Sequence, residues 1–253
     1  MLKLIAGVLV VVMAFIAVPI AFSQMEQPQT IYTYVSQFQV PRANWTQYSE
    51  DTEKTFVPVA EKMLAEGAIV SWSTSESVVH TPEGMTHSAA WSSPSIAGLM
   101  RVLDEVRKNG PRPGQIAATR HEDLLMQSTM HLGKSGSGTS GYLRVVCQMA
   151  KADRPDDYAA AIKKYLWPAF EEQFTNGAAS YVGFDQQYVN NVAPSLRCVV
   201  VVYPNAEGMD KWATAVGGTL GKLSAADREA LFGSVVPDSR RDFLARITHY
   251  HSK

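Results

Sequence analysis

Residues 93–98 read SPSIAG and residues 203–208 read YPNAEG, so a proline and a glycine recur at the same spacing 110 positions apart. The correspondence continues without a gap between Tyr32–Arg101 and Tyr142–Lys211. The shared positions are mostly prolines and glycines, where backbone geometry restricts the choice of residue. They include Pro58/Pro168, Gly67/Gly177, Ala68/Ala178, Pro94/Pro204 and Gly98/Gly208. An internal repeat of this length predicts two similar structural units.

Hydrophobic periodicity predicts the same element order in both halves: strand, helix, strand, strand, helix, strand. In the first half we expect strands at Tyr32–Val40, Ala68–Val79, Thr86–Ser92 and Leu124–Leu132, and helices at Asn44–Glu66 and from Pro94 to about Gly110. In the second half we expect strands at Tyr142–Ala150, Ala179–Val189, Leu196–Tyr203 and Phe243–His251, and helices at Pro155–Asn176, Ala206–Val216 and Ser224–Leu231. Pro58 and Pro168 lie inside the first helix of each half, so each helix should kink or restart there.

This β-α-β-β-α-β order is the ferredoxin-like arrangement. Two such units, with facing sheets and helices outside, resemble the dimeric α+β barrel superfamily, here with the dimer fused in one chain. The resemblance covers roughly Ile31–His251 and predicts a monomer with an internal pseudo-dimer. The expected boundaries are residues 24–134 for the first repeat, 135–141 for a flexible Gly/Ser linker and 142–253 for the second repeat. The superfamily includes cofactor-free monooxygenases, isomerases and haem proteins, so the fold does not select a function.

The N-terminal segment Met1–Ser23 carries one early charge, Lys3, followed by an apolar run from Leu4 to Val18. Small residues end the segment, which predicts a secretory signal peptide cleaved before Gln24. The alternative is a membrane anchor, because the run approaches the length of a spanning helix. With cleavage, we expect an exported protein, periplasmic or secreted, with no stable membrane insertion.

The overall charge is nearly balanced, with 23 basic and 24 acidic residues. There is no basic stripe along the sequence, so nucleic acid is not an expected partner.

Side-chain alternation along the strands predicts two chemically different faces. In the second half the shared face is apolar, formed by Leu143, Val145, Cys147 and Met149 and by Leu196, Cys198, Val200 and Val202. At the matching first-half positions the residues are smaller and more polar, namely Thr33, Val35, Gln37 and Gln39 and Thr86, Ser88, Ala90 and Ser92. This asymmetry predicts a small-molecule pocket in the more polar first half. Ordinary drift between repeats is the alternative.

The chain contains two cysteines, Cys147 and Cys198. They lie on strands that are neighbours in this fold, so they could meet across one sheet. In an oxidising compartment they would form a disulfide. The alternative is a pair of buried free thiols that pack as small apolar residues.

His87 and Trp91 share one face of a predicted strand, and Tyr34 could stand beside them on the neighbouring strand. Together with Gln37 and Ser88, Tyr34 and Trp91 are the predicted ligand-binding residues. His87 is the candidate general acid or base. The alternative is an aromatic cluster packed under a helix, with a histidine whose hydrogen bonds are satisfied.

His249 and His251 are two residues apart and point the same way, but a lone pair of histidines is an incomplete metal site. We therefore expect no metal and no cofactor. The leading hypothesis is an exported protein that binds a small, partly apolar molecule. The alternatives are a cofactor-independent monooxygenase or isomerase that uses His87, and a haem-binding protein whose single ligand is His87 or His131.

Overall fold

The structure is a computed structural model that describes residues 29–189 and 195–253. The predicted signal peptide, Met1–Ser23, lies outside the described residues. Within the described ranges, no helix has both the length and the apolar character needed to cross a membrane.

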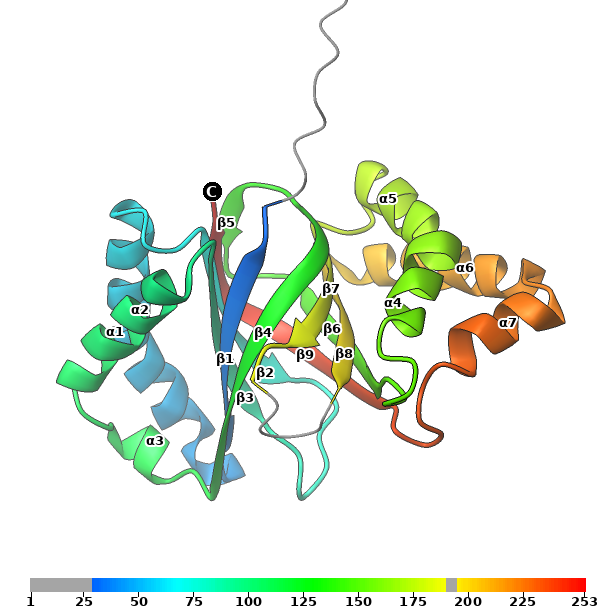
Figure 1. The fold of residues 1–253 in the computed structure, drawn as a ribbon. Helices are drawn as coiled ribbons and strands as arrows, with labels where there is room; N and C mark the ends of the chain where they lie inside the picture. The colour runs from blue at the N-terminus through cyan, green and yellow to red at the C-terminus, as the bar shows by residue number, and fades with distance from the viewer. Residues whose placement is uncertain (1–28, 190–194) are drawn as a thin grey trace, which may run out of the picture.

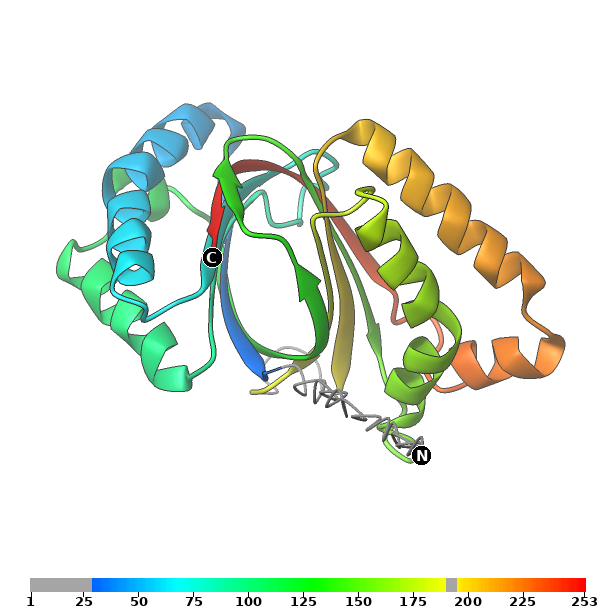
Figure 2. The ribbon, with the colours of Figure 1, turned by 90° about the horizontal axis from the view of Figure 1, so that it is seen from above.

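The described strands form a closed antiparallel barrel, which Figure 2 shows from above. Eight strands follow one another in the order β2-β3-β1-β4-β7-β8-β6-β9, and β9 closes the circle by pairing with β2. Their bounds are β1 (Ile31–Gln39), β2 (Ser71–Ser77), β3 (His87–Ser93), β4 (Arg120–Gly133), β6 (Tyr142–Met149), β7 (Tyr181–Gln187), β8 (Leu196–Tyr203) and β9 (Arg241–Ser252). The two sheets thus face each other, as expected, and are also joined edge to edge.

Helices cover the outside of the barrel in two separate layers (Figures 1 and 2). The first layer contains α1 (Trp45–Ala65) and α2 (Ile96–Lys108), with a short η1 (Arg42–Asn44) before α1 and a one-turn α3 (Pro113–Ile116) that the sequence pattern does not predict. The second contains α4 (Asp157–Ala161), η2 (Ile162–Leu166), α5 (Trp167–Thr175), α6 (Ala206–Lys222) and α7 (Ala225–Phe232). Each layer has its own apolar core against the sheet, centred on residues such as Leu99 in the first and Phe170 in the second.

The predicted Gly/Ser linker is not an open loop along its whole length. Gly136–Gly138 forms a short strand, β5, which pairs with the end of β9. The composition of this segment indicates flexibility. However, β6 pairs only with the first part of β9, and the free backbone groups at the end of β9 form hydrogen bonds with β5.

The two prolines inside helices have different effects. The first helix of the second half restarts as predicted: a π-helical segment, Ile162–Leu166, separates α4 from α5 just before Pro168. A π-turn removes the clash between the proline ring and the preceding turn. In the first half, α1 continues through Pro58 as a single helix, without a restart.

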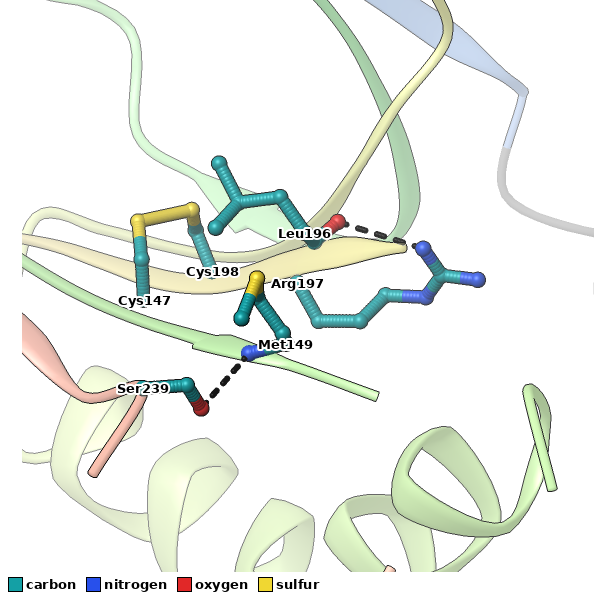
Figure 3. The surroundings of a disulfide bond; sticks show 6 residues. All are labelled: Cys147, Met149, Leu196, Arg197, Cys198 and Ser239. Carbon is teal, nitrogen blue, oxygen red and sulfur yellow. Dashed lines mark hydrogen bonds between the residues drawn. A yellow bond between two sulfur atoms is a disulfide. The ribbon is translucent and has the colours of Figure 1, made fainter. Parts of the chain in front are cut away.

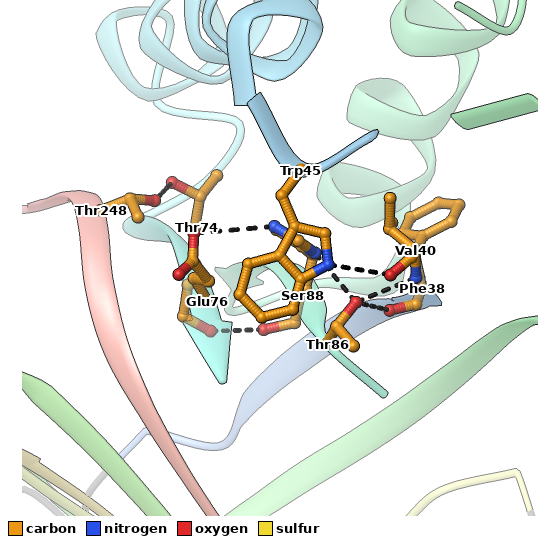
Figure 4. Close-up of polar contacts among 10 residues, drawn as sticks. Phe38, Val40, Trp45, Thr74, Glu76, Thr86, Ser88 and Thr248 are labelled. Atoms are coloured by element: carbon orange, nitrogen blue, oxygen red, sulfur yellow. Dashed lines mark hydrogen bonds and ion pairs between the residues drawn. The ribbon is translucent and has the colours of Figure 1, made fainter. Parts of the chain in front are cut away.

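The two seams that close the barrel each contain an irregularity. Pairing of β4 with β7 shifts between Ser128 and Met130, and pairing of β2 with β9 shifts between Thr74 and Ser75. At the second seam Thr74 Oγ1 lies 2.7 Å from Thr248 Oγ1 (Figure 4). A bulge adds one residue to a strand, so the alternation of inward and outward side chains shifts after it.

Candidate functional site in the barrel interior

The barrel encloses a cavity of about 750 Å³. Both halves line it, so the pocket is not confined to the first half as the sequence predicts. The chemical asymmetry predicted from strand alternation is present across the cavity, with one polar wall and one apolar wall.

The polar wall belongs to β1, β2 and β3 and consists largely of hydroxyl groups. Ser75 Oγ lies 2.7 Å from Ser88 Oγ, and Thr33 Oγ1 lies 2.9 Å from Ser92 Oγ. Other polar side chains that line this wall are Gln37, Ser71 and Ser73. Because a hydroxyl can donate or accept by rotation, this wall can hydrogen-bond polar substituents of either kind.

The apolar wall belongs to β6 and β8, with contributions from β4. Its lining residues are Leu124, Met126, Leu143, Val145, Leu196, Val200 and Val202. These aliphatic side chains favour the flat hydrocarbon part of a ligand, since contact with them removes apolar surface from water.

Cys147 and Cys198 form a disulfide in this apolar wall (Figure 3). They are directly opposite each other on β6 and β8, with Cα atoms 4.0 Å apart. Close by, the Met149 backbone N–H donates to Ser239 Oγ at 3.1 Å, which ties the end of β6 to the chain entering β9.

A polar row crosses the same wall at the level of the disulfide. Strand register places Ser128 beside Asp185, Asp185 beside Cys198, Cys198 beside Cys147, and Cys147 beside Arg241. The Ser128 hydroxyl donates to Asp185 Oδ1 at 2.7 Å. Asp185 is 5% exposed and lines the cavity, so a buried carboxyl group faces the ligand space.

Tyr181, Gly183 and Asp185 occupy alternate positions of β7, so all three share its inward face, and Gly183 lies between the other two. A Cβ atom built on Gly183 would lie 2.7 Å from Tyr181 Oη and 3.1 Å from Asp185 Oδ1. Glycine in a strand interior often marks such a close approach. Gly183 therefore leaves the space in which the phenol and the carboxyl group come near each other.

Burial raises the pKa of Asp185 to about 6, and the hydrogen bond from Ser128 offsets part of that rise. Burial also raises the pKa of Tyr181, and the nearby Asp185 charge adds to this effect. At neutral pH Tyr181 is thus a neutral hydrogen-bond donor and Asp185 is largely ionised. A carboxyl group with a raised pKa in a cavity wall is a candidate for proton transfer.

The raised pKa of Asp185 predicts a pH-dependent difference in stability between the native chain and Asp185→Asn. The folded carboxyl group holds its proton more tightly than the unfolded one, whose ordinary pKa is 3.8, so its ionisation disfavours the folded state as pH rises through about 6. The native chain should therefore lose stability relative to Asp185→Asn between pH 4 and pH 7, by on the order of 3 kcal/mol. Urea unfolding at several pH values measures this difference. Asp104→Asn, at an exposed position on α2, is the control, and parallel curves for Asp185→Asn and the native chain would contradict the prediction.

The structure separates the residues predicted to bind the ligand. Gln37 and Ser88 line the cavity, whereas Tyr34, His87 and Trp91 lie on the other face of the sheet, under α1. The reason is alternation along each strand: His87 and Ser88 are adjacent, so their side chains point to opposite faces.

Tyr34, His87 and Trp91 belong to an aromatic cluster that packs under α1. This is the alternative that the sequence analysis gives to a ligand-binding role for these residues. Tyr34 stacks on Trp91 with ring centroids 4.6 Å apart, and His87 lies 4.6 Å from Tyr48 and 5.1 Å from Trp45 by the same measure. Figure 4 shows the polar contacts around this cluster, including the Trp45 Nε1–H that donates to the Val40 carbonyl at 2.9 Å.

His87 is not placed to act on a molecule in the cavity. It is 3% exposed, and its Nδ1 lies 2.9 Å from Thr86 Oγ1. Burial, helped by the charge of Arg42, lowers the pKa of His87 to about 4, so the imidazole is neutral. The predicted acid/base role therefore does not agree with its position. Asp185, in contrast, is a buried carboxyl group that lines the cavity.

The other three histidines do not lie together in one site. His249 and His251 both point toward α1, where His249 Nε2 lies 3.8 Å from Glu53 and His251 Nδ1 lies 2.9 Å from Glu61. His131 lies on β4 directly opposite Gly183. Among the described residues, no group of three or more His, Cys, Asp or Glu side chains could hold a metal ion.

The haem alternative requires a histidine that faces the cavity. His87 does not, because it is packed under α1. His87 thus does not fit the axial-ligand role. His131 pairs with the inward Gly183, so it lies on the inner face of β4, next to the cavity lining.

Sequence reasoning missed Asp185, Tyr181 and Ser128. One signal was available: Gly183 interrupts a strand between an inward tyrosine and an inward aspartate. The position of Ser128 depends on the bulged seam between β4 and β7, which no local pattern specifies.

No protein-family model matches the chain, and no curated protein matches it. Solved structures do. A "putative monooxygenase" from Fusobacterium nucleatum is similar with a TM-score of 0.64 and 10% identity, over 89% of this chain and 96% of that one. An anthrone oxidase-like protein has a TM-score of 0.57 and 10% identity, over 88% and 93% of the two chains. A "putative chlorite dismutase" has a TM-score of 0.53 and 10% identity, over 86% and 94%.

At these identities the likeness concerns the fold alone. That fold is the ferredoxin-like α+β barrel, so the architecture expected from the element order is confirmed.

Proposed function

We propose that this chain binds a small, partly apolar molecule inside the barrel, between the hydroxyl wall and the apolar wall. The observation that carries the proposal is the cavity of about 750 Å³ with chemically opposite sides. Its size lies within the range of cavities that bury drug-sized ligands, and a few polar groups set against apolar surface are the usual composition of such sites.

The two walls support a ligand of a particular shape and polarity. The valine and leucine side chains of β6 and β8 suit a fused ring system, and the serine hydroxyls of β2 and β3 suit its oxygen substituents. An aromatic molecule with hydroxyl or carbonyl groups along one edge satisfies both walls at once.

We also propose that the barrel is a fused tandem repeat and that the protein is exported. The common element order supports the first point, as do Gly67 and Gly177, which adopt left-handed φ values of 73° and 79° at equivalent helix ends. The signal-like sequence of Met1–Ser23 supports the second, and so does a disulfide, which persists in oxidising compartments.

Filling the cavity tests the binding proposal. Val200→Phe adds a ring on the apolar wall and should weaken binding of the fluorescent probe N-phenyl-1-naphthylamine by at least about tenfold, because it occupies the space of the ligand. Ile116→Phe, at a position 68% exposed, is the matched control and should leave the dissociation constant unchanged. Fluorescence titration of both variants and of residues 24–253 gives the comparison. Equal affinity of the native chain and Val200→Phe would overturn the proposal.

A cofactor-independent oxygenase or isomerase is the second candidate function. One observation favours it: an ionisable carboxyl group, Asp185, lines the cavity. The monooxygenase and anthrone oxidase names of similar structures agree with this class. The residue that the sequence suggests for the chemistry, His87, lies on the outer face of the sheet instead.

A further inference from the structure

Three side chains from two strands form a compact polar cluster on the inner wall. Ser128 of β4 donates to Asp185 Oδ1 at 2.7 Å, and the Tyr181 hydroxyl of β7 points to the same place beside Gly183. The absent side chain of Gly183 allows the Tyr181 hydroxyl and the Asp185 carboxyl group to share one small space. Both Tyr181 and Asp185 line the cavity, so the cluster is open to a bound molecule.

The surroundings of the cluster are unusual for a purely structural group of polar residues. Most of the same wall is aliphatic or disulfide, and the cavity lies directly in front of it. A buried carboxyl group costs stability when it is ionised, so its presence beside a cavity is better explained by chemistry than by packing.

We propose that Asp185 is the general base of a proton-transfer site that acts on an enolisable aromatic ketone bound in the cavity, with Tyr181 as the hydrogen-bond donor to the ketone oxygen. This inference rests on the proposed binding function and adds the substrate class and the reacting groups.

The step conserves atoms and charge. The Asp185 carboxylate takes a proton from the carbon next to the carbonyl group, and the electron pair of that C–H bond forms the new C=C bond. The carbonyl π electrons move to oxygen, where the neutral Tyr181 O–H stabilises the enolate. Return of the proton to the same carbon regenerates the ketone, and its return to another carbon of the conjugated system gives an isomer. Neither outcome needs an oxidant or a reductant.

The charges around Asp185 set the pH at which it can act. Tyr181 on its own strand stays neutral because burial raises its pKa, and burial lowers the pKa of His131 on β4, which favours the neutral form of this imidazole. On the β8 side the neighbour is Cys198, which is bonded to Cys147 and does not titrate. Arg241, beyond the disulfide in the same row, is the cation nearest in register. Asp185 is therefore the group that should control the rate near pH 6.

Hydrogen–deuterium exchange on 2-tetralone tests the proposal. The native chain, residues 24–253, should accelerate deuterium incorporation at the α-carbon above the buffer rate. The rate should rise with pD through an apparent pKa of about 6. Asp185→Asn should lower the protein-catalysed rate at least about 100-fold while 2-tetralone still binds. Tyr181→Phe should lower it by about tenfold or more, because one donor to the enolate is lost. Asp104→Asn is the matched control on α2 and should exchange at the native rate.

Binding of 2-tetralone is measured separately, by displacement of N-phenyl-1-naphthylamine, so that the two proposals fail in different ways. Displacement with equal exchange rates in the native chain and Asp185→Asn overturns the catalytic inference and leaves the binding function standing. Binding of the fluorescent probe without displacement overturns the substrate class. No binding of either molecule overturns both proposals. If Asp185→Asn does not fold, the pD profile of the native chain decides, and a flat profile between pD 5 and 8 contradicts the role of Asp185.

Discussion

Replacement of Gly208 by valine is expected to lower the free energy of unfolding by about 3 kcal/mol or more, since the new side chain would enter occupied space. A Cβ atom at this position would lie 2.4 Å from the carbonyl oxygen of Ala178. That oxygen belongs to the backbone and cannot rotate away. The Gly208 N–H also donates to Asn205 Oδ1 at 2.9 Å, so any shift of the helix start breaks its cap.

The same change in the first half should have a comparable effect. A Cβ atom on Gly98 would lie 2.1 Å from the carbonyl oxygen of Ala68 and 2.3 Å from Ser93 Oγ, and the Gly98 N–H donates to the capping Ser95 at 3.1 Å. The repeated proline and glycine therefore mark the start of the second helix in each half. At this point the helix packs directly against the backbone that connects the first helix to the second strand.

The control for both variants lies in α6 itself. A Cβ atom on Gly217 would have no neighbouring atom within 4 Å, so Gly217→Ala should stabilise the chain by up to about 1 kcal/mol through helix propensity. Urea unfolding followed by circular dichroism compares the three variants with the native chain. A Gly208→Val variant as stable as the native chain would show that the helix can move away from Ala178 at little cost.

This contact explains why the fold could be read from the sequence. The positions that match between the halves are those where geometry permits few residues, and Gly98 and Gly208 are two of them. Alternation along β1, β3, β6 and β8 then sorts the inward from the outward side chains correctly, because each strand is short and regular. The predicted polar and apolar walls follow directly from that alternation.

The candidate site was predicted less well, for two physical reasons. First, aromatic residues beside a histidine are typical both of a ligand pocket and of the outer face of a sheet that packs under a helix, so the sequence alone does not distinguish the two. His87 and Trp91 belong to that outer face. Asp185, in contrast, is defined by its neighbours across two strand pairings, one of them the bulged seam at Ser128, and such long-range register is absent from any local pattern.

Removal of the disulfide is the second large effect that we expect. Replacing both Cys147 and Cys198 by alanine opens a loop with a sequence separation of 51 residues, and the chain-entropy model assigns a bond of that span a stabilisation of about 4 kcal/mol. That is a large share of the roughly 5–15 kcal/mol that typically separates folded from unfolded domains. The double variant should therefore unfold at a clearly lower urea concentration than the oxidised native chain.

Reduction provides the matched control, because it removes the bond without changing the sequence. The native chain unfolded in urea with a strong reductant should approach the stability of the double variant, whose own midpoint should not respond to the reductant. Since the bond stabilises the barrel only where it can form, this result would tie full stability to an oxidising compartment and so support the export proposed from Met1–Ser23. Equal midpoints for all four samples would mean that the two sulfur atoms are not joined in solution, and the export proposal would then rest on the N-terminal sequence alone.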